Sequence, residues 1–421
     1  MMQLVVKGLL VARAGQRCLA AVLRLVAPCL PGVEEVPCAN TGRMWLLRLG
    51  LYELTRPKPQ ADDWVLIMDH TVQIGTLKVL VIVGVRLSEW EPQRGPLRHE
   101  QMTLLDLMPM RHSDGQAVEA RLKVVAETTG TPRAIVCDGG SDLRRGIANF
   151  RQDHAEVACL YDIKHKTALL LQSQLDKDPR WAKFITCVNQ TRSRVTLTDL
   201  ACLIPPSLKP KARYMNLPPL VRWGQDALAF LDHPRDLPGQ PIQPAILEAK
   251  LGWLREYREA LYHWSVLLTI ADTAEKYVRA EGYHAGTAEE LRRRLDGLEI
   301  NAAAAAMRTA LVEFVETESV QARPGERLIG SSEVIESLIG KYKQLQGTYR
   351  QGGVTPLVLG LGAMVANHTT ETIRRAMQDT RTVDVLRWCH EHLGLTLQAL
   401  RRFAMKEQNP DTKRLSTSAS F

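Results

Sequence analysis

The sequence predicts an α/β protein with one mixed sheet, whose strands and helices follow the order βββαβαβ, and with a long all-α insertion. Three consecutive apolar runs between residues 64 and 110 are separated by turn residues, as successive strands are. Two shorter apolar runs, at residues 134–138 and 156–162, alternate with stretches of helical periodicity. Beyond residue 162, apolar residues recur almost entirely at helical spacing as far as about residue 406.

The composition is that of a globular protein with a basic surplus. The chain has 421 residues, 45% of them hydrophobic, and a mean hydropathy of −0.15. This is neither a disordered nor a fibrous composition, and the length allows roughly two to four domains. Lys and Arg number 54 against 46 Asp and Glu, for a formal net charge of +8. The surplus favours a polyanionic partner, with nucleic acid as the leading candidate.

Cysteine usage and hydropathy indicate a cytoplasmic protein. The eight cysteines are scattered and form no C-x-x-C pair, which is typical of a reducing compartment. The longest apolar run, residues 77–87, is far shorter than the ~20 residues that span a membrane. We therefore expect a buried strand there and no membrane partner.

The first 60 residues are expected to form a helical segment. Residues 16–30 and 43–54 have helical periodicity and are separated by a turn-rich stretch. Asn40 or Thr41 is a suitable N-cap for the second helix, and Gly50 falls near its predicted end. The pattern fits a helix-turn-helix DNA reader, and it fits a small helical lead-in equally well. The proline-marked residues 55–63 are expected to be a linker.

The elements of the predicted sheet follow in order. The first three strands are expected at residues 64–75, 77–87 and 102–110. A helix over residues 115–128 leads to the fourth strand at residues 134–138, and a helix over residues 142–151 leads to the fifth at residues 156–162. At the other end of the chain, residues 408–421 are polar and are expected to be a disordered tail.

Two aspartates occupy strand positions that this order brings together. Asp69 lies in the first strand, and Asp138 closes the fourth just before Gly139 and Gly140, which let the chain turn away. Two acids at neighbouring strand ends repel each other unless a cation neutralises them, and Mg²⁺ prefers such oxygen ligands. The alternative is that each aspartate caps a turn or helix.

A third acidic position lies far along the chain, in residues 329–343. Ser331 or Ser332 can cap a helix there, and Glu333 and Glu336 then lie three residues apart on one face, nearly in line with Lys343. One helix face thus offers carboxylates and an ammonium group. The alternative is an exposed helix with ordinary surface charges.

These residues together carry a resemblance. Asp69, Asp138 and a Glu in a helix that begins SSEVIES resemble the catalytic triad of DDE transposases with an RNase H-like fold. The run Asp162-Ile163-Lys164-His165 is similar to the Cys/Asp-x-x-His signature of Mutator-like, hAT-like and bacterial insertion-sequence transposases. The form of the acidic helix favours Glu336 over Glu333 as the third ligand.

The resemblance implies a domain plan and a reaction. It implies an RNase H-like catalytic core at residues 61–170 and 330–365, an all-α insertion at 171–329 and C-terminal helices at 366–407. Asp69, Asp138 and Glu336 would hold two Mg²⁺ or Mn²⁺ ions for DNA cleavage at transposon ends and strand transfer into target DNA. The expected partners are those DNAs and further copies of the chain assembled on them, in the nucleoid of a prokaryote. The alternatives are an RNase H-like nuclease without strand transfer and a degenerate or repurposed DNA-binding derivative.

The remaining candidates concern DNA contacts. The resemblance implies that Asp162 and His165 position the DNA strand or a neighbouring acid. Arg144, Arg145 and Lys343 would contact DNA phosphates, although solvated surface charge explains them equally well. Trp264 is a candidate for stacking on an unpaired base, and a core position is the alternative for an aromatic at helical spacing.

Overall fold

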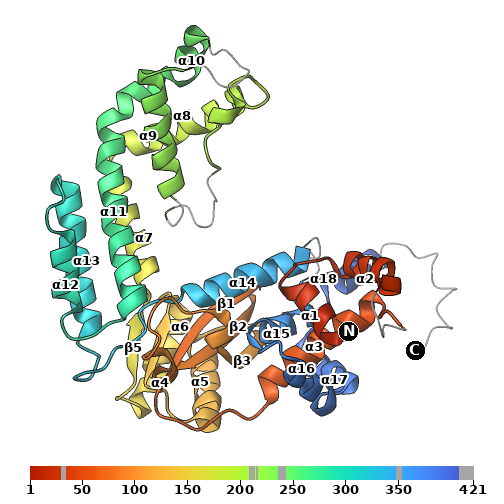
Figure 1. The fold of residues 1–421 in the computed structure, drawn as a ribbon. Helices are drawn as coiled ribbons and strands as arrows, with labels where there is room; N and C mark the ends of the chain where they lie inside the picture. Colours follow the sequence, from red (N-terminus) through yellow and green to blue (C-terminus); the bar gives the residue numbers. More distant parts are fainter. Residues whose placement is uncertain (30–34, 208–213, 215–216, 236–242, 348–352, 407–421) are drawn as a thin grey trace. The chain divides into compact units, whose positions relative to one another are not determined.

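The computed structural model describes residues 1–29, 35–207, 214, 217–235, 243–347 and 353–406. The predicted disordered tail at residues 408–421 lies outside these ranges. The chain forms two compact units, shown in Figure 1. Unit 1 combines Met1–Cys159 with Ser332–Phe421, and unit 2 is Leu160–Ser331.

A five-stranded mixed sheet, with the strand order β3-β2-β1-β4-β5, is the centre of the fold. β1 pairs antiparallel with β2, β2 pairs antiparallel with β3, and β1 pairs parallel with β4. The strands are β1 (Trp64–Ile74), β2 (Leu77–Arg86), β3 (Thr103–Met110), β4 (Ala134–Cys137) and β5 (Ala158–Tyr161). The predicted α/β class, with one mixed sheet, is confirmed.

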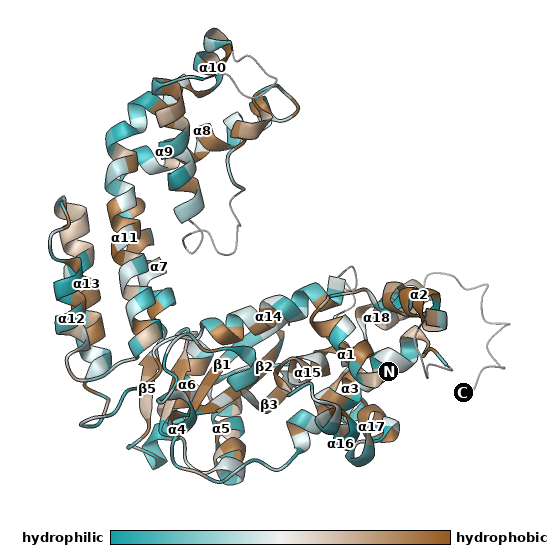
Figure 2. Cartoon of the chain, viewed as in Figure 1, coloured by the Kyte–Doolittle hydropathy of each residue, from teal (hydrophilic) through white to brown (hydrophobic). Residues whose placement is uncertain are grey.

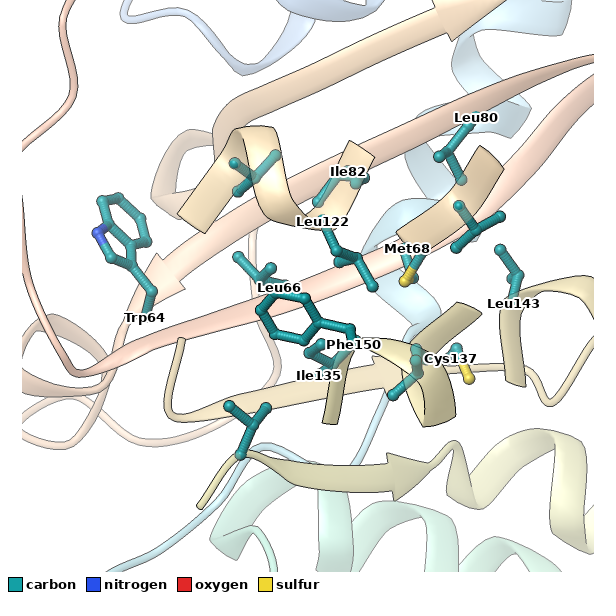
Figure 3. Close-up of a cluster of buried hydrophobic side chains, with 14 of the residues drawn as sticks. Trp64, Leu66, Met68, Leu80, Ile82, Leu122, Ile135, Cys137, Leu143 and Phe150 are labelled. Carbon is teal, nitrogen blue, oxygen red and sulfur yellow. The ribbon is translucent and has the colours of Figure 1, made fainter. Parts of the chain in front are cut away.

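One face of the sheet is covered by α5 (Gly115–Thr129) and α6 (Ser141–Asp153). Figure 3 shows this core, in which alternate residues of β1, β2 and β4 meet apolar side chains of the two helices. The strand residues Leu66, Met68 and Cys137 are at most 2% exposed. Burial of each large apolar side chain is worth roughly 1.5–3 kcal/mol, so this layer fixes the sheet register.

The opposite face of β1 is covered by α14 (Glu333–Gln346), which packs against this strand. β1 is a central strand, and no residue of α14 belongs to the cluster under α5 and α6. The helix therefore lies on the other face. At the β3 side of the sheet, α15 (Gly360–Val365) and α3 (Ala39–Thr55) pack against β3.

Helix α3 joins the two ends of the chain. It packs against α15, α16 (Thr370–Asp379) and α17 (Thr382–His392), and Arg48 Nε donates a hydrogen bond of 2.6 Å to the Thr380 carbonyl. α1 (Met2–Leu10) and α2 (Gln16–Val26) also pack against α3. The last described helix is α18 (Leu397–Lys406).

Three details of the predicted N-terminal segment differ from the structure. α3 begins at Ala39, after the N-cap residue Cys38, so neither Asn40 nor Thr41 caps it. Gly50 lies inside the helix, where a Cβ would come within 1.8 Å of the Leu359 carbonyl oxygen, so it serves a close backbone approach and not a helix end. Because α3 is buried on several sides by its neighbours, it offers little surface for the major groove of DNA.

Unit 2 is helical and has a core of its own. Its helices are α7 (Ile163–Leu175), α8 (Pro179–Val195), α9 (Pro218–Asp232), α10 (Pro244–Leu251), α11 (Arg258–Glu281), α12 (Thr287–Leu295) and α13 (Ala302–Ser319). α11 is the longest of them and packs against α7, α9, α12 and α13. Trp181, Phe184 and Trp264 form an aromatic cluster, with ring centroids 4.9–5.9 Å apart.

Hydrophobic residues concentrate along the strands of the sheet, as the brown colouring of β1 and β2 shows in Figure 2.

No helix within the described ranges is both long and apolar enough to cross a membrane.

Candidate active site

Asp69 lies in β1, and Asp138 directly follows the neighbouring strand β4. Met68 of β1 is the register partner of Cys137, the last residue of β4, so each aspartate comes one residue after this last pair. The two strands run parallel; Asp69 lies in the middle of β1, and Asp138 stands at the carboxyl end of the shorter β4. That the two acids act together stays a prediction.

Both aspartates belong to the face that α14 covers. Met68 and Cys137 point into the core beneath α5 and α6, and side chains alternate between the faces of a strand. Asp69, and Asp138 by continuation of β4, are therefore directed to the other face. Both side chains are partly exposed, as a site that admits a substrate requires.

Short hydrogen bonds from the backbone hold the two carboxylates. Oδ1 of Asp69 accepts from the His70 N–H at 2.6 Å, and Oδ1 of Asp138 accepts from the Gly140 N–H at 2.9 Å. Gly139 has a φ of +80°, a backbone conformation that side chains disfavour, and this allows the sharp turn after β4. The glycine pair thus orients Asp138 while clearing the strand end.

Glu333 and Glu336 occupy the first turn of α14 in the same unit. Ser332 occupies the N-cap position of this helix, one of the two positions predicted, but its side chain makes no capping hydrogen bond. Each glutamate is partly exposed and has one carboxylate oxygen shielded from solvent. The apolar side of the helix, including Ile335, Leu338 and Ile339, is buried and anchors α14. This anchoring fixes the acidic turn in unit 1, on the side of the sheet to which the aspartates point.

The chemical class of the three predicted ligands suits a hard divalent cation. Asp69, Asp138 and a glutamate of α14 supply only carboxylate oxygens, the ligands that Mg²⁺ and Mn²⁺ prefer. Partial exposure leaves room for water and substrate, which a catalytic ion needs and a structural ion does not. The chemistry of these side chains therefore fits the metal that the resemblance implies.

A polar network that the sequence analysis missed adjoins Asp69. His70 Nε2 lies 2.9 Å from Ser113 Oγ, and His70 Nδ1 lies 3.8 Å from Asp142 Oδ2. Lys78 Nζ donates to the same Asp142 oxygen at 2.8 Å. The four residues come from β1, β2, the turn before α5 and the first turn of α6. A His directly after a strand aspartate was the one available sequence signal.

The charge states in this network follow from burial and from hydrogen bonds. Burial lowers the pKa of His70, with Lys78 acting in the same direction and Asp142 against it, so the imidazole is held neutral. For Asp142, burial acts to raise the pKa, but the hydrogen bonds from Lys78 and Ser113 outweigh it and lower the pKa. A neutral His70 and an ionised Asp142 result near pH 7.

Asp162 and His165 form a tight pair at the start of α7 in unit 2. The fully buried Asp162 is the N-cap residue, and its Oδ2 accepts from the His165 N–H at 2.9 Å. The same oxygen lies 2.7 Å from His165 Nδ1. A proton on Nδ1 satisfies this contact, which leaves the lone pair of the neutral ring on Nε2.

The basic candidates lie on exposed surface. Arg144 and Arg145 are exposed in α6, just after Asp138, and the Arg145 side chain lies against Gly115 at the start of α5. Lys343 is exposed near the end of α14. The structure thus places all three within unit 1, on helices that begin or end near the sheet.

Trp264 is a core residue. It is 2% exposed, packs edge-on against Trp181, and donates from Nε1 to Asp178 Oδ2 at 3.1 Å. Its ring faces are covered, so in this arrangement it is not offered to an unpaired base. The core position is the better interpretation of the helical spacing of the aromatics.

No protein-family model matches the chain, and no curated protein does. Among solved structures, one described as the Drosophila P element transposase strand transfer complex aligns with 89% of this chain and 93% of its own. The sequence identity is 12% and the TM-score is 0.43. These values are too low to assign a function, which has to come from the residues of the chain itself.

Proposed function

We propose that the chain is a transposase that cuts DNA at transposon ends and joins the freed ends to target DNA. One observation carries the proposal. The pairing of β1 with β4, whose last register pair immediately precedes Asp69 and Asp138, and the packing of α14, with Glu333 and Glu336 in its first turn, against β1 support it. Asp69, Asp138 and the two glutamates are carboxylates of unit 1, the ligand type that a hard divalent cation prefers.

In this proposal, Asp69, Asp138 and Glu336 hold two divalent ions, Mg²⁺ or Mn²⁺. Such ions, when bound, neutralise charge on the phosphate and activate the attacking oxygen. The protein contributes orientation: the backbone N–H groups of His70 and Gly140 fix one oxygen of each aspartate. The buried face of α14 keeps the glutamate from moving.

The DNA-positioning roles belong to the surrounding polar groups. We assign Arg144, Arg145 and Lys343 to phosphate contacts, since all three are exposed cations of unit 1. His165, with its ring oriented by Asp162, would help to position the DNA strand. Further copies of the chain would assemble on the DNA.

The decisive experiment compares isosteric variants in two assays. Asp69→Asn, Asp138→Asn and Glu336→Gln should each weaken Mn²⁺ binding and reduce nicking of supercoiled plasmid by about a hundredfold or more, because each removes a charged ligand. Glu333→Gln is the matched control on the same helical turn and should be milder. Wild-type activity in any of the first three variants would remove that residue from the site.

A joining assay separates the transposase from a nuclease. The wild-type protein is incubated with Mg²⁺, plasmid and a labelled oligonucleotide that has a 3′-hydroxyl end. Transfer of the label to the plasmid supports the transposase. Nicking without transfer supports an RNase H-like nuclease, and DNA binding without either activity supports a degenerate derivative.

A further inference from the structure

A basic cavity in unit 1 lies apart from the acidic residues. Its volume is about 440 Å³, and it is lined by residues of α1, α2, α3 and α14. Arg13, Arg17, Arg43 and Lys341 contribute to its wall. Among the described residues that line it, none is Asp or Glu. Four cations around one cavity repel each other, and an anion held there would relieve this.

Two helix starts add to the positive field. Gln16, Arg17 and Cys18 are the first residues of α2, and Ala39 and Asn40 are the first residues of α3. Neither helix has a side-chain cap or an acidic residue in its first turn. The backbone N–H groups and the positive ends of two helix dipoles therefore meet at this wall.

The basic side chains of the cavity are available to bind an anion. Lys341 Nζ lies 2.6 Å from His99 Nδ1, a contact that uses one of its three donors. Arg13 has a φ of +53°, a conformation that is uncommon outside glycine. Strained backbone of this kind is found where a side chain is held in a particular place. The C-terminal ends of α1 and α14 also reach the cavity and partly offset the two positive helix ends, so the four basic side chains supply its positive charge.

We propose that this cavity binds a backbone phosphate of the DNA, outside the acidic site. The guanidinium fork of arginine matches a phosphate, and three arginines with two uncapped helix starts form a site for a phosphodiester group. Lys341 and Gln344 lie on the same helix as Glu336. Eight residues separate Glu336 from Gln344 (344 − 336), or ~12 Å of helix rise, which corresponds to roughly three to four nucleotides of duplex. The inference rests on the proposed function, which makes DNA the substrate.

The test uses the full-length chain and a matched charge control. The variant R13Q/R17Q/R43Q removes three charges from the cavity. The control R292Q/R293Q/R294Q removes three from α12, where the arginines pair with Glu289 and Glu290. Binding of a fluorescein-labelled duplex oligonucleotide is measured over a range of NaCl concentrations, and circular dichroism checks folding. The cavity variant should bind about tenfold more weakly or worse, with a salt slope smaller by about 1, while the control stays near wild type. Equal affinity and slope in the two variants overturn the proposal.

Cys18 gives a second readout that needs no variant. It lines the cavity and is exposed, whereas Cys202 is an exposed cysteine of unit 2. Duplex DNA should slow the alkylation of Cys18 relative to Cys202, as followed by mass spectrometry. If inorganic pyrophosphate or a mononucleotide protects Cys18 and DNA does not, the cavity takes a free phosphate ligand and the DNA assignment is wrong.

The two proposals fail in distinguishable ways. A wild-type protein that binds DNA through the cavity but neither nicks nor joins it refutes the transposase and keeps the phosphate site. A wild-type protein that cleaves through Glu336, with R13Q/R17Q/R43Q unimpaired in binding and cleavage, refutes the phosphate site alone.

Discussion

Glu318, a buried carboxylate of α13, shows how a single residue ties helices of unit 2 to the segment before Asp162. Its Oε2 accepts from the Tyr161 N–H at 3.1 Å, and the side chain is 8% exposed. Burial raises the pKa of Glu318 to about 7, against the smaller effects of the Tyr161 hydrogen bond and Lys166. The folded protein therefore holds this proton more tightly than the unfolded chain does.

The stability of unit 2 should depend on pH through this residue. The free energy of unfolding is highest below the ordinary pKa of 4.5, falls as the pH rises to about 7, and then levels off. Glu318→Gln keeps an acceptor for Tyr161 but cannot ionise, so at pH 8 it should be more stable than wild type by up to about 3 kcal/mol. Urea denaturation at pH 5 and pH 8 measures this. The exposed Glu316→Gln is the control, and an equal gain from it would contradict the assignment.

Variants of Asp162 and His165 should distinguish a structural role from a functional one. Asp162→Ala removes the N-cap acceptor of α7 and should cost about 0.5–2 kcal/mol of stability. His165→Ala leaves the cap in place, so its melting temperature should stay close to wild type while single-turnover cleavage falls. Parallel melting and cleavage assays test both. A large loss of melting temperature in His165→Ala would make the histidine structural.

The residues that sequence reasoning could identify are those with a strong local context. Asp69 lies within an apolar strand and Asp138 directly follows one, and that context alone places them at the sheet. The network of His70, Lys78 and Asp142 had no such context, because its members meet only through the register of β1 with β2 and the turn into α6. Side-chain contacts across elements are set by tertiary packing.

At the scale of elements, the close approach of α3 to the segment Pro356–Leu359 depends on the absence of a side chain at Gly50. The Cβ of an alanine would lie 1.8 Å from the Leu359 carbonyl oxygen, and backbone cannot move aside cheaply. Gly362 makes the reciprocal approach, since its Cβ would lie 2.5 Å from the Gly50 carbonyl oxygen. Helix packing at this crossing is therefore specified by two glycines.

Gly50→Ala should lower the stability of unit 1 by several kcal/mol or prevent folding, although alanine favours helix over glycine by about 1 kcal/mol. Gly340→Ala is the matched control in α14, where nothing lies within 4 Å of the added Cβ. The control should be neutral or stabilising by about 0.5–1 kcal/mol. Thermal melts of the two variants decide, and a stable Gly50→Ala would contradict the close packing.

The strands were predictable because their apolar runs and turn residues are local. β1, β2 and β4 lie within a few residues of the predicted ranges. The surroundings of α3 could not be predicted. An apolar helix has the same sequence pattern whether it packs against a neighbouring helix or, as here, against helices at the far end of the chain. Neither α1 nor the burial of Gly50 had a local signal strong enough to identify it.

At the scale of the molecule, the N-terminal helices belong to the core of unit 1. A chain that begins at Trp64 would leave the apolar surfaces of α15, α16 and β3 without α3. We expect such a fragment to be poorly soluble and to bind a hydrophobic dye, with no cooperative melt for unit 1. A soluble fragment that melts cooperatively and loses only DNA affinity would instead make residues 1–63 a separate DNA-binding domain.

The interlocking of α3 with α15–α17 also bears on how the protein is made. On the ribosome, α3 emerges early, but its partners follow only after all of unit 2, which is 172 residues (331 − 160 + 1). At ordinary rates of translation this is a delay of roughly 10–30 s, during which unit 2 can fold and unit 1 cannot be completed. A premature stop codon anywhere before residue 380 would therefore release a nascent chain with an unfinished sheet domain, so shortened products should be cleared by proteases rather than survive as competing DNA-binding forms.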